Sequence, residues 1–259
     1  MRSSRKANIA LLVFACVLAL AVFAWINRPR DEPAKATVDE AVRSFREDGG
    51  AAGEGDRAGG PPFGVYRYAT RGSESAQTPL AGATHDYGGI STIVISEGPC
   101  GLRERWQVLE GRWSEGEACT NSGEETLRIT EYHEFFGIGQ EDTFRCHGEP
   151  ISDSLARRPG AHFSSTCESD DSSISNSSRI VGLERIPVGA EDYKAVHVET
   201  RSLIEGENSG IARSEEWRRR SDGLLLRRTV ESDADASTGG GTHYSEECTI
   251  RLLEATPRR

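Results

Sequence analysis

The sequence predicts a mainly β protein with consecutive antiparallel strands and an N-terminal transmembrane helix. Three observations lead to this prediction. Residues 9–26 are an uninterrupted apolar run, most segments after Pro62 alternate apolar and polar residues, and turns rich in Gly or Asp separate those segments. Such alternation is typical of strands that have one face buried and the other in water.

The apolar run at the N-terminus is long enough to cross a bilayer. Residues 9–26 (IALLVFACVLALAVFAWI) contain no charge, no Gly and no Pro, and as a helix they would span roughly 27 Å, close to the thickness of the hydrocarbon core. Arg2, Arg5 and Lys6 precede the run, and no acidic residue accompanies them. Because positive charge favours the cytoplasmic side, we expect a single-pass anchor in the cell membrane, with the N-terminus cytoplasmic and the bulk of the chain extracytoplasmic.

A cleaved signal peptide is the alternative interpretation of this segment. Residues 19–21 (ALA) and 22–24 (VFA) both resemble small-x-small cleavage sites, and cleavage would make the protein secreted. Apolar residues nevertheless continue through Trp25 and Ile26 up to the charged residues 28–30, as in an anchor that stops transfer. The domain is expected to be exported in either case.

The chain divides into three parts. Residues 1–27 are the predicted cytoplasmic tip and transmembrane anchor. Residues 28–62 are rich in Gly, Ala, Asp, Glu and Pro and too poor in apolar residues to build a core, so we expect a flexible stalk, in which residues 37–48 could form a short helix. Residues 63–255 are the predicted extracytoplasmic β domain.

Strands are predicted along the whole of this domain. The alternation is clearest in residues 193–204, where Val196 and Val198 share one face. Residues 170–178 (DDSSISNSS) are expected to be a polar loop, and residues 149–160 could hold a short helix. The predicted strands are 64–70, 90–97, 102–109, 113–120, 126–136, 143–147, 162–168, 180–188, 193–204, 211–219, 224–231 and 243–253.

Five cysteines follow the apolar run, in a compartment where disulfides persist. Their spacing suggests two local bridges, Cys100 with Cys119 and Cys146 with Cys167, each closing a loop of about 20 residues and contributing about 3 kcal/mol. Cys248 is then left over, free or intermolecular, and this odd count leaves the pairing open. No cysteine or histidine spacing indicates a metal site.

The charge balance argues against polyanionic partners. The chain carries 31 basic and 41 acidic residues, a formal net charge of −10. This charge opposes binding of nucleic acid and of anionic lipid headgroups by the bulk of the surface. Acidic and basic residues are interleaved along most segments, which is typical of a solvated sheet face.

We find no catalytic constellation in the sequence. His133-Glu134 lacks the second histidine of a zinc-protease helix, and we expect all six histidines to be solvated or in loops. No Gly-x-Ser-x-Gly nucleophile turn is present, and the glycines of residues 28–62 form no phosphate loop. We therefore expect no enzyme activity, no catalytic residue and no cofactor.

The apolar face of the predicted sheet is the remaining candidate site. Ordinary core packing explains its tryptophans. The functional alternative is a cavity, in which a curved sheet with few covering helices presents this face to an apolar ligand. The candidate ligand-binding residues are Trp106, Val108, Val196, Val198, Trp217, Leu224 and Leu226.

Two stretches resemble envelope domains with a LolA-like or LppX-like half-barrel. Residues 182–198 (GLERIPVGAEDYKAVHV) resemble two strands linked by a turn with Pro, Gly and an aromatic residue. Glu216-Trp217, followed by residues 221–227 (SDGLLLR), resembles a Trp-containing strand that leads into a Gly-Leu hairpin. The resemblance implies a single curved antiparallel sheet, an open half-barrel wrapped partly around few short helices, with a hydrophobic groove used in handling lipids or lipoproteins.

These observations predict a membrane-anchored extracytoplasmic binding module that holds a lipid or other apolar ligand in the sheet groove. Residues 9–26 would contact the membrane, and no nucleic acid is expected as a partner. The alternative hypothesis is a structural or sensory envelope protein that binds a protein partner through its sheet surface. An open groove would favour the first hypothesis, and the same residues packed against one another would favour the second.

Overall fold

The structure is a computed structural model in which residues 33–259 form one compact unit. Within the described residues, no helix has the length and apolarity needed to cross a bilayer. The predicted anchor, residues 9–26, lies outside them, as does most of the segment 149–160, for which the sequence predicts a short helix. The described residues are 33–48, 60–98, 101–121, 124–148, 158–236 and 241–259.

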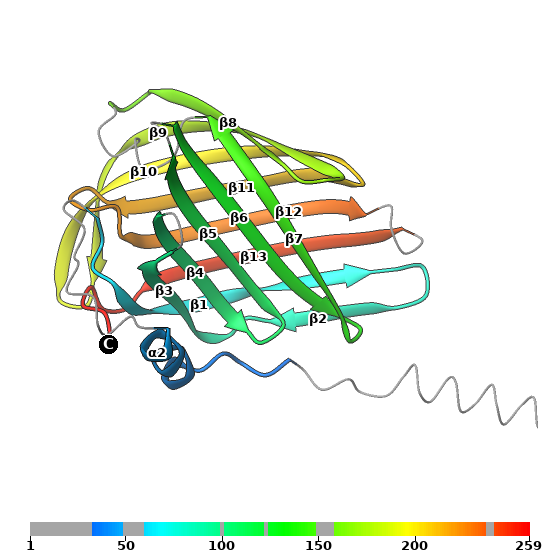
Figure 1. Ribbon diagram of the computed structural model, residues 1–259, viewed down its shortest axis with the longest axis horizontal. Coiled ribbons are helices and arrows are strands. Elements are labelled where there is room, and N and C mark those ends of the chain that lie inside the picture. The colour runs from blue at the N-terminus through cyan, green and yellow to red at the C-terminus, as the bar shows by residue number, and fades with distance from the viewer. Residues whose placement is uncertain (1–32, 49–59, 99–100, 122–123, 149–157, 237–240) are drawn as a thin grey trace, which may run out of the picture. The chain divides into compact units, whose positions relative to one another are not determined.

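The described residues contain one helix and a sheet of thirteen strands (Figure 1). The helix is α2 (Val38–Glu47), and the strands are β1 (Gly64–Gln77), β2 (Gly82–Asp86), β3 (Gly89–Glu97), β4 (Gly101–Leu109), β5 (Arg112–Asn121), β6 (Glu124–Phe135), β7 (Ile138–Gly148), β8 (His162–Glu168), β9 (Ser172–Val188), β10 (Glu191–Gly206), β11 (Asn208–Arg219), β12 (Leu225–Ala236) and β13 (Thr242–Leu252).

The sheet is antiparallel, and from β3 to β13 each strand pairs with the next one in sequence. The first and last strands also pair, from Tyr68 opposite Leu252 to Gln77 opposite His243. This pairing closes the sheet into a barrel of twelve strands. The open half-barrel expected from the sequence is therefore wrong.

The length of β1 explains why the sheet closes. On one side its first half pairs with β3 and its second half with β2, while its other side pairs with β13. Closure satisfies the backbone groups that an open sheet would leave bare at the edges of β1 and β13. Local alternation cannot encode this pairing, because it joins residues from opposite ends of the domain.

One predicted loop is part of a strand. Residues 172–178, expected to lie in a polar loop, form the first half of β9 and pair with β10. The polar side chains there pair across the strands: the Ser178 and Thr200 hydroxyls lie 2.8 Å apart, and Ser202 donates to Asn176 over 2.7 Å. A strand of serines is stable at this place because its side chains form hydrogen bonds with side chains of the neighbouring strand.

The apolar core is divided into three clusters. The largest joins β1, β3, β4 and the strands from β9 to β13 and includes Tyr66, Tyr68 and Trp106. A second cluster is formed by Phe163, Ile180, Val196 and Val198. A third surrounds the cysteines of β7 and β8 and includes Phe144, Cys146 and Cys167.

Helix α2 is amphipathic and packs against the barrel. Thr37 caps its N-terminus by accepting a hydrogen bond from the Glu40 backbone N–H at 3.3 Å. Phe45 is buried, and Arg46 donates to the Arg259 backbone carbonyl over 2.6 Å. The predicted domain boundaries at residues 27 and 62 stay a prediction; the structure adds that this part of the expected stalk contacts the domain.

The Cys146–Cys167 disulfide predicted from the spacing is present. It joins directly opposite residues of β7 and β8. The second expected bridge involves Cys100, which lies outside the described residues. Cys248, on β13, is buried and unpaired, and burial raises the pKa of its thiol to about 12.

Candidate functional site

The seven candidate groove residues are buried side chains of the core. Val196 and Val198 belong to the second cluster. The largest cluster contains the other five, Trp106, Val108, Trp217, Leu224 and Leu226. None is more than 6 % exposed. They are brought together by packing against other side chains, and their role in binding a ligand stays a prediction.

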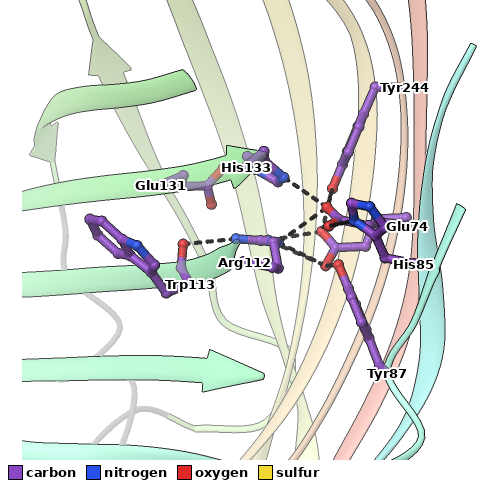
Figure 2. A network of polar contacts seen from close by, with 9 residues as sticks. Glu74, His85, Tyr87, Arg112, Trp113, Glu131, His133 and Tyr244 are labelled. Atoms are coloured by element: carbon purple, nitrogen blue, oxygen red, sulfur yellow. Dashed lines mark hydrogen bonds and ion pairs between the residues drawn. The ribbon is translucent and has the colours of Figure 1, made fainter. Parts of the chain in front are cut away.

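The polar interior of the barrel contains a different constellation (Figure 2), centred on the carboxylate of Glu74. Glu74 lies on β1, and its side chain is completely shielded from solvent. Its Oε1 lies 3.0 Å from His85 Nδ1, on β2, and its Oε2 lies 2.9 Å from His133 Nδ1, on β6. The Tyr244 hydroxyl donates to the same Oε2 over 3.3 Å. Glu74 thus joins strands from both sides of the barrel.

A second carboxylate, Glu246 on β13, binds the buried guanidinium of Arg112, on β5. The Nη2 atom of Arg112 lies 3.0 Å from Oε2, and its Nε lies 3.3 Å from Oε1. The Tyr87 hydroxyl donates to Oε1 over 2.9 Å, and the Tyr244 hydroxyl oxygen lies 3.1 Å from Oε2, so Glu74 and Glu246 share its single proton. Arg112 Nε also lies 3.7 Å from Glu74, so one guanidinium serves both carboxylates.

His133 connects the two sides of this polar network. Its Nδ1 faces Glu74, and its Nε2 lies 3.8 Å from Glu131. Carboxylates only accept hydrogen bonds, so a ring that faces one at each nitrogen fits best as the imidazolium, which carries two donors. Burial and Arg112 lower the pKa of His133, but the contacts with Glu131 and Glu74 outweigh them and raise it above its ordinary value.

Two further members of the network, Glu74 and Arg112, are held in their charged states, and Tyr87 is held in its neutral state. Burial raises the pKa of the Glu74 carboxyl, but the hydrogen bonds from His133 and His85 outweigh it and bring it to about 2. Burial lowers the pKa of Arg112, and Glu246 more than reverses this effect. Burial and the nearby Glu246 raise the pKa of Tyr87, so this tyrosine is a neutral donor.

Aromatic rings surround the network. His85 stacks on Phe135 with ring centroids 4.6 Å apart, and Phe135 meets the edge of Tyr244 at 6.2 Å. Tyr87 lies edge-on to Trp106 at 6.0 Å. These rings restrict the access of water, which strengthens the charge interactions.

A second group of charges lies between β4, β11 and β12. Glu216 accepts from Arg218 and Arg228, each over 2.7 Å, and both arginines also face Glu104. Burial raises the pKa of Glu216, but the two arginines bring it to about 2. The two carboxylates and two guanidinium groups balance, so the group is neutral.

Chemically, both groups are suited to holding strands together. Every carboxylate, arginine and histidine described above has a partner of the opposite kind inside the protein. Within the described residues, no group of His, Cys, Asp and Glu side chains could hold a metal ion.

This network was not predicted, although the sequence contains a signal for it. Three histidines that we expect to be solvated or in loops, His85, His133 and His197, lie on strands with their rings against carboxylates. Glu74 and Tyr68 are separated by an even number of positions on β1, so both side chains lie on the inner face of the barrel. A carboxylate at an apolar position of the alternation indicates a buried ion pair.

No family model matches the chain, and no curated protein matches it. Among solved structures, the chain is similar to the hypothetical lipoprotein YmcC from Escherichia coli (K12), with 9 % identity, a TM-score of 0.33 and coverage of 73 % of this chain and 86 % of that one. It is also similar to a putative exported protein with a YmcC-like fold from Bacteroides fragilis, with 11 % identity, a TM-score of 0.28 and coverage of 74 % and 99 %. These likenesses are too low to support an argument, and the LolA-like or LppX-like resemblance stays a prediction.

Proposed function

We propose that the protein is a non-catalytic component of the cell envelope that works by binding a protein partner on the outer surface of its barrel. The observation that carries the proposal is the packing of the seven candidate groove residues, none of which is more than 6 % exposed. A lipid-binding groove requires apolar side chains that a ligand can reach. Here those side chains contact one another instead.

A location outside the cytosol is part of the proposal. The Cys146–Cys167 disulfide favours an oxidising compartment. The apolar N-terminal run favours export, by an anchor or by a cleaved signal. Both observations support an envelope protein without deciding between the single-pass and the secreted form.

The buried charge groups suit a rigid binding scaffold. They join β1, β2, β5, β6 and β13 in one group and β4, β11 and β12 in the other. Fully paired charges in an interior favour one arrangement of the strands. A rigid outer surface binds a partner with a smaller entropic cost than a flexible one.

The outer surface also carries apolar residues that packing does not explain. Leu203, on β10, and Ile211, on β11, lie directly opposite each other and are 48 % and 54 % exposed. They provide a position from which contact with a partner can be measured. Val198, on β10 and 1 % exposed, provides the matched interior position.

Site-specific photo-crosslinking in cells tests the proposal. A photoreactive residue placed at Ile211 in the full chain is expected to form an adduct with a defined protein, while the same residue at Val198 forms none. An adduct between the probe at Val198 and a lipid would overturn the proposal in favour of the lipid-binding hypothesis. Lack of protein adducts from every exposed strand position would also overturn it.

A further inference from the structure

Strand β7 is paired along its whole length on only one of its two sides. On that side, β6 pairs with it from Ile138 to Cys146. On the other side, β8 pairs only with residues 145–148. Within the described part of the chain, no strand therefore pairs with residues 138–144 on this second side, and in Figure 1 β7 meets β8 only at its end.

The unpaired side of β7 is accessible. Residues 138–141 and Thr143 are exposed, and the Ile138 side chain is 72 % exposed. In an antiparallel strand, alternate residues direct their N–H and C=O groups away from the paired neighbour. Residues 138–144 thus present backbone donors and acceptors in the geometry that an added strand requires.

The charges on this edge favour a basic partner strand over a second copy of the same strand. Residues 138–144 (IGQEDTF) contain Glu141 and Asp142 and no basic residue. The neighbouring strand adds Glu134, opposite Gly139. Pairing with the same edge of a second copy would place like charges together, which is destabilising, whereas a basic strand would place opposite charges together.

We propose that the edge of β7 at residues 138–144 accepts an extended, basic segment of a partner protein as an additional strand. This inference rests on the proposed function and specifies the place and chemistry of the contact. Backbone hydrogen bonds would hold the segment, and Glu141 would favour lysine or arginine beside it. Ile138, at the end of the strand, would contact an apolar side chain of the segment.

Hydrogen exchange of the full chain in detergent micelles tests the inference with defined probes. A seven-residue peptide of alternating Lys and Val is expected to slow exchange of the backbone amides of residues 138–144, while the matched peptide of Glu and Val does not. Glu141→Lys should weaken binding of the Lys–Val peptide by about threefold or more. The control Glu207→Lys, an exposed glutamate between β10 and β11, should leave binding unchanged.

Different results would contradict the strand addition and the proposed function. The inference is overturned if both peptides slow amide exchange of residues 138–144 equally, or if neither does. If exchange slows with increasing protein concentration in the absence of peptide, the edge instead binds a second copy of the chain. A photo-crosslinking residue at Gln140 distinguishes this failure from failure of the proposed function. A protein adduct from Ile211 but none from Gln140 would overturn the strand addition alone, and protein adducts from no exposed position would overturn both.

Discussion

The Nδ1 atom of His133 lies 2.9 Å from the Oε2 atom of Glu74, so a histidine of β6 contacts a fully buried carboxylate of β1 across the barrel interior. This contact joins two strands that are far apart in the order of the sheet. It therefore couples two strands that β3, β4 and β5 separate in the sheet, and the stability of the fold should depend on both residues.

Glu74→Gln should destabilise the protein strongly. The amide keeps the shape of the side chain but removes the negative charge that faces His85, His133 and Arg112. Removing one partner of a buried ion pair costs about 3–5 kcal/mol. The free energy of unfolding in urea measures the effect, and Glu247→Gln, an exposed neighbour of Glu246 on β13, is the control. A loss below about 1 kcal/mol, the range of exposed pairs, would show that the network does not support the fold.

The contribution of His133 should fall as pH rises. Its pKa in the folded protein is raised, so its charged form is favoured by folding. The resulting stability is fully present below the pKa of the unfolded chain, about 6.5, and is lost as pH rises through the higher folded value. We expect the difference in unfolding free energy between the native protein and His133→Gln to be largest near pH 5 and to decrease toward pH 9.

The matched control for this measurement is His243→Gln. His243 lies on β13 with its side chain 43 % exposed, beside Asp233 and Asp235. Exposed pairs of this kind contribute little. Equal pH dependence of the two variants would contradict the role assigned to His133.

Most of the strands could be predicted from the sequence, but β2, the second half of β1 and the closure of the sheet could not. Residues 193–204, predicted from alternation, lie within β10 (Glu191–Gly206). Closure depends on the register between β1 and β13. These strands lie at opposite ends of the domain sequence, so no local pattern predicts their pairing. Residues 172–178 escaped prediction because their serines resemble a loop in composition, although their partners on β10 make them a strand.

The partners of Glu74 could not be predicted from the sequence, for a related reason. The alternation places Glu74 on the inner face of β1, but nothing local indicates that Arg112 and His133 will meet it there. Their meeting requires the closed barrel. The predicted Cys146–Cys167 bridge is present because it depends only on a short loop and two neighbouring strands.

Arg112 and Glu246 should be strongly coupled in a double-mutant cycle. Arg112→Leu leaves the Glu246 carboxylate buried with only the hydroxyls of Tyr87 and Tyr244, and Glu246→Leu leaves the guanidinium with Glu74 as a distant partner. Each single variant should lose about 3–5 kcal/mol. The double variant should lose less than the sum, since neither charge is then left alone. Additive losses would show that the two side chains act independently.

Removal of the disulfide should destabilise the third core cluster. Cys146 and Cys167 are separated by 21 positions in the sequence, and opening a loop of this size costs about 3 kcal/mol in the chain-entropy account. The bridge also lies among Phe144, Leu127 and Ile129, so replacing both cysteines with alanine should increase hydrogen exchange in β7 and β8 more than in β1 and β13. Cys248→Ala is the control, because it removes a buried thiol without opening a loop. A uniform increase in exchange across all strands would show that the bridge supports the whole barrel rather than this wall.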